Sequence, residues 1–274
     1  MIGKEIQMNF IAMNTIIEKQ KLTFSIMKMQ SRASRTLVMG DPHGGLKAIQ
    51  QVLDRCYFNF EKDTLIVLGD VADGWPEVAE SFEFLIENVK KLIYVRGNHD
   101  QWLKDWLKNE KKKPNVWTMQ GGQNSIKSYE RHPELKKKHY EFLKKTNQFY
   151  IDDKNRVFVH GGVDLYDGTR LKDKMYLMWD RHLWEERGLV QRFSGKDTLF
   201  SEVFVGHTSI YREHQEPARY GIVTFMDTGG GWEGKLSVMD IDTKEIWQSD
   251  LVSSLYPDSN GRLESLITLL SKNI

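Results

Sequence analysis

Along the chain, short continuous apolar runs alternate with stretches in which apolar residues recur at helical spacing. This alternation predicts a succession of strands and helices. Three short runs rich in Leu, Ile, Val and Met, at residues 36–41, 64–70 and 91–96, are typical of buried strands. Between these runs, apolar side chains recur every three or four positions over Gly45–Tyr57 and Glu77–Val89, which predicts two amphipathic helices. This alternation predicts a mainly parallel sheet with right-handed crossovers.

The second half of the chain has the pattern of strands joined by short connections. Five strands are predicted, at Arg156–His160, Glu202–Gly206, Gly221–Met226, Lys235–Ile241 and Glu245–Gln248. Because strands this close in sequence tend to pair with one another, we expect them to form a second, mixed or antiparallel sheet packed on the first. A helix is expected over Met175–Gly188, between the first two of these strands.

The stretch 101–150 has a different character, and it predicts a helical insertion over the sheet. Gln101–Lys108 has the pattern of a short helix, and Pro133–Lys145 that of a Lys-rich helix. The pair Gly121–Gly122 indicates a turn between them. The lysines of this insertion form either a solvated face or a surface that attracts an anionic substrate.

Composition places the chain among ordinary globular proteins. Of its 274 residues, 40% are hydrophobic and 28% are charged. This length suits one domain at 35–255, with an N-terminal extension at 1–34 and a helical C-terminal tail at 256–274. The net charge of +1 favours no particular partner, so we expect neither nucleic acid nor a membrane as partner, and a monomer is compatible with the sequence. The single cysteine, Cys56, excludes an internal disulfide and predicts a cytoplasmic protein.

Polar side chains follow the predicted strands directly. Asp41, Asp70 and Asn98 come after the first three strands, at intervals of about thirty residues, the length of one strand–helix–strand unit. Because parallel strands end at the same edge of a sheet, we expect these side chains to meet there. Two later strands end at histidine. The complete set of polar residues at strand ends is Asp41, His43, Asp70, Asp73, Asn98, His99, His160 and His207.

Carboxylate, amide and imidazole groups together suit two divalent metal ions, with manganese preferred and iron or zinc as alternatives. We expect Asp70 to bridge the two ions. Such a pair can activate water near neutral pH and neutralise the charge of a phosphate group. The alkoxide of a phosphomonoester is a poor leaving group, so an acid is needed as well. His99 is the candidate acid, with its proton held by a carboxylate such as that of Asp73.

Taken singly, each of these motifs has an ordinary structural explanation. A Gly-Asp pair after a strand is commonly a turn, and a lone histidine is more often a surface or core residue than a ligand. We interpret the four remaining histidines in this way, namely His132, His139, His182 and His214. The occurrence of five motifs in one order along the chain is what favours a site.

These motifs resemble those of the calcineurin-like metallophosphoesterases. They are Gly40-Asp41-Pro42-His43-Gly44, Gly69-Asp70-Val71-Ala72-Asp73-Gly74, Arg96-Gly97-Asn98-His99-Asp100, His160-Gly161-Gly162 and Gly206-His207-Thr208. Within this superfamily, the chain is most similar to the bacterial and phage-type serine/threonine phosphoprotein phosphatases (PPP family). The resemblance spans about residues 36–250, and it implies an α/β fold that is a four-layer αββα sandwich of two mixed sheets with a helical insertion.

The resemblance also implies roles for individual residues. The first metal ion would be held by three of them, Asp41, His43 and Asp70. The second ion would share Asp70, and its other ligands would be Asn98, His160 and His207. His99 would be the general acid, oriented by Asp73.

Two arginines are implied to bind substrate, and the arginine usual in one motif is missing. Arg96 would face the phosphate, and Arg181, in Met178-Trp179-Asp180-Arg181, resembles the second phosphate-binding arginine of the family. Arg181 could equally be a surface helix residue. In the phosphatases, Arg-Gly follows the second aspartate of the Gly-Asp motif, but here these positions hold Gly74 and Trp75. A bidentate clamp on the phosphate is therefore missing, and Trp75 would form an apolar wall in its place.

A glycine-rich stretch, Asp227–Trp232, follows a predicted strand and has two interpretations. Its three glycines either allow a loop to lie close to the metal ions or form a plain hairpin turn, because another strand begins directly afterwards. The sequence leaves both open.

Three functions are compatible with these observations. The first is a metal-dependent serine/threonine phosphoprotein phosphatase, whose partner is a phosphorylated protein or a small phosphoester. The second is a hydrolase of dinucleoside polyphosphates such as diadenosine tetraphosphate, which the same kind of site can cleave. The third is a non-catalytic scaffold, which the intact ligand set and His99 speak against.

Overall fold

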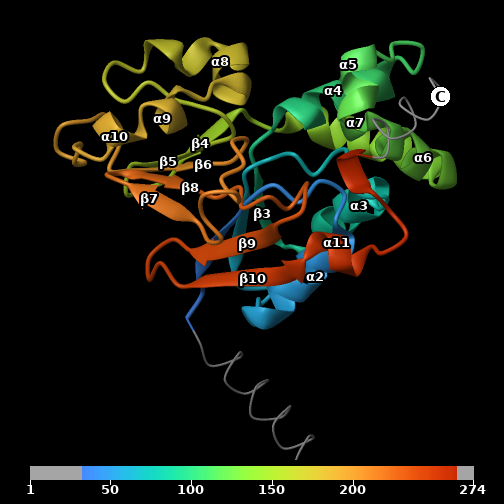
Figure 1. Ribbon diagram of the computed structural model, residues 1–274, viewed down its shortest axis with the longest axis horizontal. Helices are drawn as coiled ribbons and strands as arrows, with labels where there is room; N and C mark the ends of the chain where they lie inside the picture. The colour runs from blue at the N-terminus through green and yellow to red at the C-terminus, as the bar shows by residue number, and fades with distance from the viewer. Residues whose placement is uncertain (1–32, 264–274) are drawn as a thin grey trace, which may run out of the picture. The chain divides into compact units, whose positions relative to one another are not determined.

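The computed structural model describes residues 33–263, which contain two five-stranded sheets (Figure 1). The predicted extension at 1–34 lies outside the described residues except for its last two positions. The part of the predicted C-terminal tail at 264–274 also lies outside them.

The first sheet contains the strand–helix units that the sequence pattern predicts. β1 (Thr36–Met39), β2 (Thr64–Val67) and β3 (Lys91–Tyr94) are parallel neighbours in this sheet. The connections between them are α2 (Leu46–Arg55) and α3 (Val78–Asn88). The mainly parallel arrangement predicted for this part of the chain is confirmed.

Two strands predicted for the second sheet belong to the first one instead. β9 (Lys235–Asp240) pairs antiparallel with β1, where Leu37 lies opposite Asp240, and β10 (Ile246–Leu251) pairs antiparallel with β9. Closeness in sequence to the preceding strands does not decide their pairing, because the free edge of β1 pairs with a strand from the far end of the chain. The expectation that all five later strands share one sheet is therefore wrong.

The second sheet is mixed, as expected, and contains two strands that the sequence pattern did not predict. Its spatial order is β4 (Phe149–Ile151), β5 (Arg156–Val159), β6 (Glu202–Val205), β8 (Val223–Phe225) and β7 (Ala218–Tyr220). The β5–β6 and β6–β8 pairs are parallel, while the outer pairs are antiparallel. β4 ends the stretch assigned to the helical insertion, and β7 is a short strand at the opposite edge.

Most of the stretch between β3 and β4 is helical, in agreement with the predicted insertion, but it contains more elements than the pattern shows. They are α4 (Asn98–Lys108), α5 (Asn115–Trp117), η1 (Thr118–Gly122), α6 (Gln123–Arg131), η2 (Pro133–Leu135) and α7 (Lys136–Lys145). The expected turn at Gly121–Gly122 is a kink, where Gly121 has a φ of 100° and joins η1 to α6. α4 begins three residues earlier than predicted, at Asn98.

The predicted helix over Met175–Gly188 is broken into short pieces. η3 (Thr169–Lys172) and α8 (Lys174–Trp179) precede the break, and α9 (His182–Glu185) and α10 (Arg187–Val190) follow it. Asp180 has an extended backbone conformation and ends α8. The break exposes Arg181, which lies between the two helices.

Alternate residues of the central strands belong to different buried clusters, which define four layers. In β1, Leu37 and Met39 pack with side chains of α2 and α3, while Val38 belongs to a cluster between the two sheets. In β5, Phe158 joins that inter-sheet cluster, and Val159 packs with residues of α8–α10. Each sheet therefore has helices on its outer face and the other sheet on its inner face (Figure 1). The predicted αββα sandwich is confirmed.

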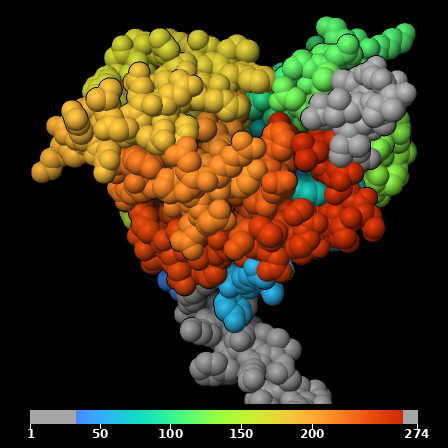
Figure 2. Space-filling view, viewed as in Figure 1, coloured from blue at the N-terminus to red at the C-terminus, as the bar shows by residue number. Residues whose placement is uncertain are grey.

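The described part of the C-terminal tail lies on the domain, and only its last residues are helical. α11 (Val252–Leu255) follows β10, and η4 (Gly261–Leu263) is a single 3₁₀ turn. In Figure 2 this red segment lies on the visible face, beside the green residues of the helical insertion. Helical structure predicted for 256–260 is not observed. No helix in the described part of the chain is long and apolar enough to cross a membrane.

Replacing Phe204 by alanine is expected to lower the free energy of unfolding by about 3–5 kcal/mol, because it removes a large buried ring between the sheets. Phe204 of β6 stacks on Phe158 of β5, with ring centroids 4.9 Å apart and 6° between the ring planes. Urea denaturation measures the change. Met175→Ala, at a position 62% exposed, is the control and should change stability by at most about 0.5 kcal/mol. Equal effects of the two substitutions would contradict this account of the inter-sheet core.

Candidate metal centre

The loops that follow the strands bring acidic and imidazole groups together at one place. Two groups of side chains each offer ligand atoms within 4.8 Å of one another, the first Asp41, His43 and Asp70, and the second Asp70, His160 and His207. Asp70 belongs to both groups. Because the first group comes from the first sheet and both histidines of the second follow strands of the second sheet, the site lies where the two sheets meet.

Asn98 completes the second group. Its Oδ1 atom lies 2.9 Å from Nε2 of His160, and the same nitrogen lies 3.2 Å from Oδ2 of Asp70. The structure thus brings together all six residues that sequence reasoning proposed as metal ligands. We call them the ligand cluster, which consists of Asp41, His43, Asp70, Asn98, His160 and His207.

Hydrogen bonds outside the cluster orient two of its imidazoles as metal ligands require. Nδ1 of His160 lies 2.7 Å from the carbonyl oxygen of Leu68, and Nδ1 of His43 lies 3.0 Å from that of Ala72. Because each ring donates an N–H to these carbonyls, Nε2 remains available for a cation. The buried Oδ1 of Asp41 has no hydrogen-bond partner among the described residues, as expected of an atom that would bind a cation. The residues present therefore fit a pair of divalent ions.

The backbone of the cluster is strained at the ligands themselves. His43, Asp70 and His207 have φ angles of 45°, 49° and 60°, in the left-handed region that residues with a side chain rarely adopt. Asp73 shares this conformation, with a φ of 68°. Each such residue costs about 1–3 kcal/mol, and strain of this kind is concentrated at functional sites.

Burial and mutual charge raise the pKa of some groups in the cluster and lower the pKa of others. Burial, together with the charge of Asp227, raises the pKa of Asp41 well above its usual value. Burial, reinforced by the neighbouring His160, lowers the pKa of His207 to about 2. Burial alone would lower the pKa of His160, but the Asp70 carboxylate outweighs it and raises that pKa to about 9. A bound cation would replace protons in this arrangement, because it stabilises ionised carboxylates and neutral imidazoles.

His99 and Asp73, the proposed acid and its orienting carboxylate, form a direct pair. Nδ1 of His99 lies 2.6 Å from Oδ2 of Asp73, and the backbone N–H of His99 donates to Oδ1 of Asp70 at 2.9 Å. Two residues of the helical insertion hold Asp73 in turn. Nε1 of Trp117 donates to it at 2.9 Å, and Oγ of Ser125 at 2.6 Å. Sequence reasoning missed both of them, because nothing in the local pattern of the insertion points to the site.

Asp100 is a further residue to which sequence reasoning gave no role, although it belongs to a recognised motif. Its carboxylate accepts hydrogen bonds from the backbone N–H groups of Asp70 and Gly97 at 2.9 Å and of Ala72 at 3.0 Å. It also accepts one from the hydroxyl of Tyr94 at 2.9 Å. Burial raises the pKa of Asp100 to about 6, with Asp70 contributing in the same direction. Asp100 thereby ties the loop after β2 to the loop after β3.

The glycine-rich loop between β8 and β9 lies against the ligand cluster. A Cβ atom on Gly231 would collide with the ring of His43, and one on Gly230 would approach the carbonyl oxygen of Asp41 to 2.6 Å. Nε1 of Trp75 donates a hydrogen bond to the carbonyl of Gly230 at 2.7 Å. Of the two interpretations that the sequence left open, the structure favours a loop close to the ligands.

The two arginines proposed to bind substrate have different surroundings. Arg181 is exposed, and its Nη1 atom lies 3.5 Å from the carbonyl oxygen of His207, beside the second ligand group. Arg96 is buried, and its Nη1 atom donates to the carbonyl of Leu143 in α7 at 3.1 Å. This contact ties Arg96 to the helical insertion, so the structure brings Arg181, but not Arg96, to the ligand cluster.

Comparison with known proteins relates this arrangement to a family. A family model described as calcineurin-like phosphoesterase matches residues 34–233. Over 210 residues the chain is 24% identical to serine/threonine-protein phosphatase 1 of Salmonella typhimurium, a match that covers 74% of this chain and 90% of the relative. A stretch of 65 residues is 38% identical to the symmetrical bis(5'-nucleosyl)-tetraphosphatase of Pseudomonas fluorescens, and covers 24% of this chain and 23% of that relative.

A solved structure has the same fold. It is that of a protein serine/threonine phosphatase from Saccharomyces cerevisiae, with a TM-score of 0.56 and 13% sequence identity. The match covers 85% of this chain and 84% of the other. At this low identity the likeness concerns the fold alone.

Asp70→Asn is expected to abolish binding of both metal ions, because Asp70 is the one acidic residue common to the two groups. His207→Asn should remove one ion and leave the other, because His207 belongs to a single group. Elemental analysis of protein dialysed against Mn²⁺ measures the ions per chain, with two expected for the unaltered protein. Circular dichroism confirms that each variant is folded. Two retained ions in folded Asp70→Asn protein would contradict a shared ligand.

Proposed function

The chain belongs to the calcineurin-like phosphoesterases, and from this premise we propose that it is a metal-dependent serine/threonine phosphoprotein phosphatase. The difference in coverage between the two kinds of relative supports this substrate class. The Salmonella phosphatase aligns over nine-tenths of its length, whereas the Pseudomonas tetraphosphatase aligns over less than a quarter of its own.

The observation that carries the proposal is the His99–Asp73 pair next to the shared Asp70. When bound, two divalent ions, with manganese preferred, would supply a nucleophile from water near neutral pH and neutralise the charge on the phosphoryl oxygens. Asp41 and His43 would hold one ion, Asp70 would hold both, and the remaining members of the ligand cluster would hold the other. Divalent ions and a positioned acid together suit attack on a phosphate whose leaving group is a serine or threonine alkoxide.

His99 would deliver the proton that the leaving group needs. Its Nδ1 atom is engaged with Asp73, so Nε2 is the ring atom that would face the reacting phosphate. Its backbone N–H is fixed on Asp70, which keeps the distance between acid and ligands constant. The phosphorus–oxygen bond to the side chain breaks as a bond to the oxygen of a hydroxide ion forms, and the proton of His99 goes to the departing alkoxide. The hydroxide would come from water that has released a proton to solvent. Arg181 would contact the phosphate from the side of His207.

His99→Asn is expected to reduce kcat for an aryl phosphate and a phosphopeptide by about 10²–10⁴-fold, which is the usual contribution of a positioned acid. The loss should be larger for the phosphopeptide, because its alkoxide needs the proton more than a phenolate does. Two bound manganese ions should remain. His132→Asn is the matched control, since His132 bonds to Glu80 away from the ligand cluster. Unchanged turnover in metal-loaded His99→Asn protein would contradict the acid role.

A second candidate function, symmetric hydrolysis of diadenosine tetraphosphate, is favoured by the 38% identity over 65 residues. We expect kcat/KM for phosphoserine or phosphothreonine peptides to exceed that for the dinucleotide, and chelation with EDTA to abolish both activities. The purified protein, reconstituted with Mn²⁺, is assayed with both substrates at equal metal content. Efficient formation of ADP from the dinucleotide, with negligible release of phosphate from peptides, would reverse the assignment.

A further inference from the structure

The C-terminal segment brings a second arginine, Arg262, to the ligand cluster. One nitrogen of its guanidinium, Nη2, lies 3.1 Å from Nε2 of His99, and the other, Nη1, lies 3.5 Å from Nε2 of His43. Oε1 of Gln120 accepts a further hydrogen bond from Nη2 at 3.3 Å. Arg262 thus reaches the atom of His99 from which a proton would be delivered.

This arginine has donor capacity that its protein contacts do not use. Its Nε atom is buried and has no hydrogen-bond partner among the described residues. The guanidinium lies over the ring of Trp232, in the glycine-rich loop, with Cζ 4.3 Å from the ring centroid. A planar cation held against this ring, with Nη1 and Nη2 directed at His43 and His99, is preorganised to bind two oxygens of a phosphate through these two nitrogens.

The stem of Arg262 lies against position 74. A Cβ atom on Gly74 would lie 3.4 Å from Cγ of Arg262 and 2.9 Å from Cβ of His43, and Gly74 has a φ of 85°. A Cβ atom on Gly121 would lie 3.2 Å from the same Cγ atom. The stem of Arg262 therefore passes over two glycines, and a side chain at position 74 is disfavoured by His43 and by the positive φ.

Trp75, the other unusual residue of that motif, supports the segment that carries Arg262. The ring of Tyr256 stacks on the indole of Trp75, with centroids 5.4 Å apart and 17° between the planes. A Cβ atom on Gly261 would lie 3.1 Å from the six-membered ring of Trp75. The segment thus rests on Trp75 at two points, one residue before Arg262 and six residues before it.

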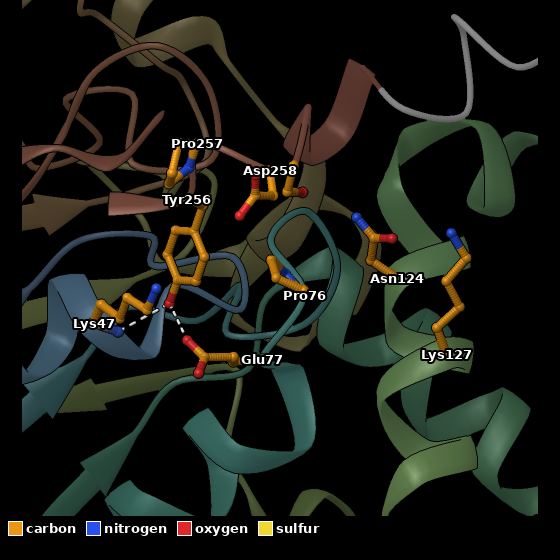
Figure 3. A pocket seen from close by; sticks show the side chains of 9 residues that line it. Lys47, Pro76, Glu77, Asn124, Lys127, Tyr256, Pro257 and Asp258 are labelled. Carbon is orange, nitrogen blue, oxygen red and sulfur yellow. Dashed lines mark hydrogen bonds between the residues drawn. The ribbon is translucent and has the colours of Figure 1, made fainter. Parts of the chain in front are cut away.

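Polar contacts fasten the same segment, and Figure 3 shows those of Tyr256 beside a pocket at its edge. The hydroxyl of Tyr256 points between α2 and α3, where it donates to Glu77 and accepts from the backbone N–H of Lys47 at 2.9 Å. From α6, Nδ2 of Asn124 donates to the carbonyls of Gly74 at 2.5 Å and of Gly261 at 3.3 Å. The position of Arg262 is therefore determined by the domain.

We propose that Arg262 is the bidentate phosphate-binding residue of this site, supplied by the C-terminal segment in place of an arginine at position 74. This inference rests on the proposed phosphatase function, because it specifies how the phosphoryl group is held. Tyr256 is a positioning residue, which acts through Arg262. Binding of phosphate would engage Nη1 and Nη2 and free Nε2 of His99 from its contact with the guanidinium.

The test is equilibrium binding of inorganic phosphate to the full chain loaded with Mn²⁺, measured by calorimetry beside the metal content. Arg262→Ala is expected to raise the Kd of phosphate by about 10- to 100-fold, because two charge-assisted hydrogen bonds are lost. Arg262→Lys should recover only part of this loss, since an ammonium group is not bidentate. Arg55→Ala is the control, because Arg55 of α2 forms an ion pair with the exposed Asp250 of β10. Both metal ions should remain in every variant.

A double-mutant cycle separates positioning from general stability. Tyr256→Phe should raise the Kd of phosphate by about 2- to 5-fold in the unaltered protein and should have no further effect in the Arg262→Ala background. Additive effects of the two substitutions would contradict a role of Tyr256 through Arg262.

Two outcomes would overturn the proposal for Arg262. One is unchanged phosphate binding in metal-loaded Arg262→Ala protein, and the other is tighter binding, which would show that the segment covers the site. Failure of the proposed function gives a different result. In that case phosphate binding would still depend on Arg262, but no phosphoester would be hydrolysed by the unaltered protein.

Discussion

The geometry of the site depends on one buried carboxylate that lies beneath it, that of Asp100. By collecting three backbone N–H groups from two loops, Asp100 holds Asp70 in a left-handed conformation that a free chain would avoid. The same constraint requires glycine at position 97, where a Cβ atom would collide with the Asp70 carboxylate. His99 is fixed on Asp70 in turn, so the proposed bridging ligand and the proposed acid share one support.

The two sheets contribute different ligands to this site. The carboxylates, the amide and His43 follow β1, β2 and β3, whereas His160 and His207 follow β5 and β6 of the other sheet. The hydrogen bond from the backbone N–H of His207 to Asp41, at 2.8 Å, joins the two sets directly. The packing of Phe158 and Phe204 between the sheets therefore fixes the distance between the two groups of ligands as well as stabilising the core.

The sequence revealed the strand ends and their ligands because each of these signals is local. An apolar run followed by Gly-Asp or Gly-His lies within a few residues, and the common edge follows from the parallel order. The features that the pattern could not predict depend on contacts between distant segments. Examples are the pairing of β9 with β1 and the hydrogen bond from Trp117 to Asp73. Arg262 is the clearest case, since the missing arginine was visible at Gly74 but its replacement lies far along the chain. The apolar spacing likewise favours one continuous helix over Met175–Gly188. Asp180, which packs against Gly162, breaks this helix.

The left-handed ligands link the folding of this protein to the supply of divalent ions. Four strained residues and several buried, mutually repelling charges are concentrated in the loops of the cluster, and cations that bind to the folded state only would offset the energy that they cost. Each tenfold rise in free cation above its Kd would then add about 1.4 kcal/mol per bound ion to the stability of the fold. Through this thermodynamic linkage, metal availability would regulate how long the protein survives as well as how fast it works.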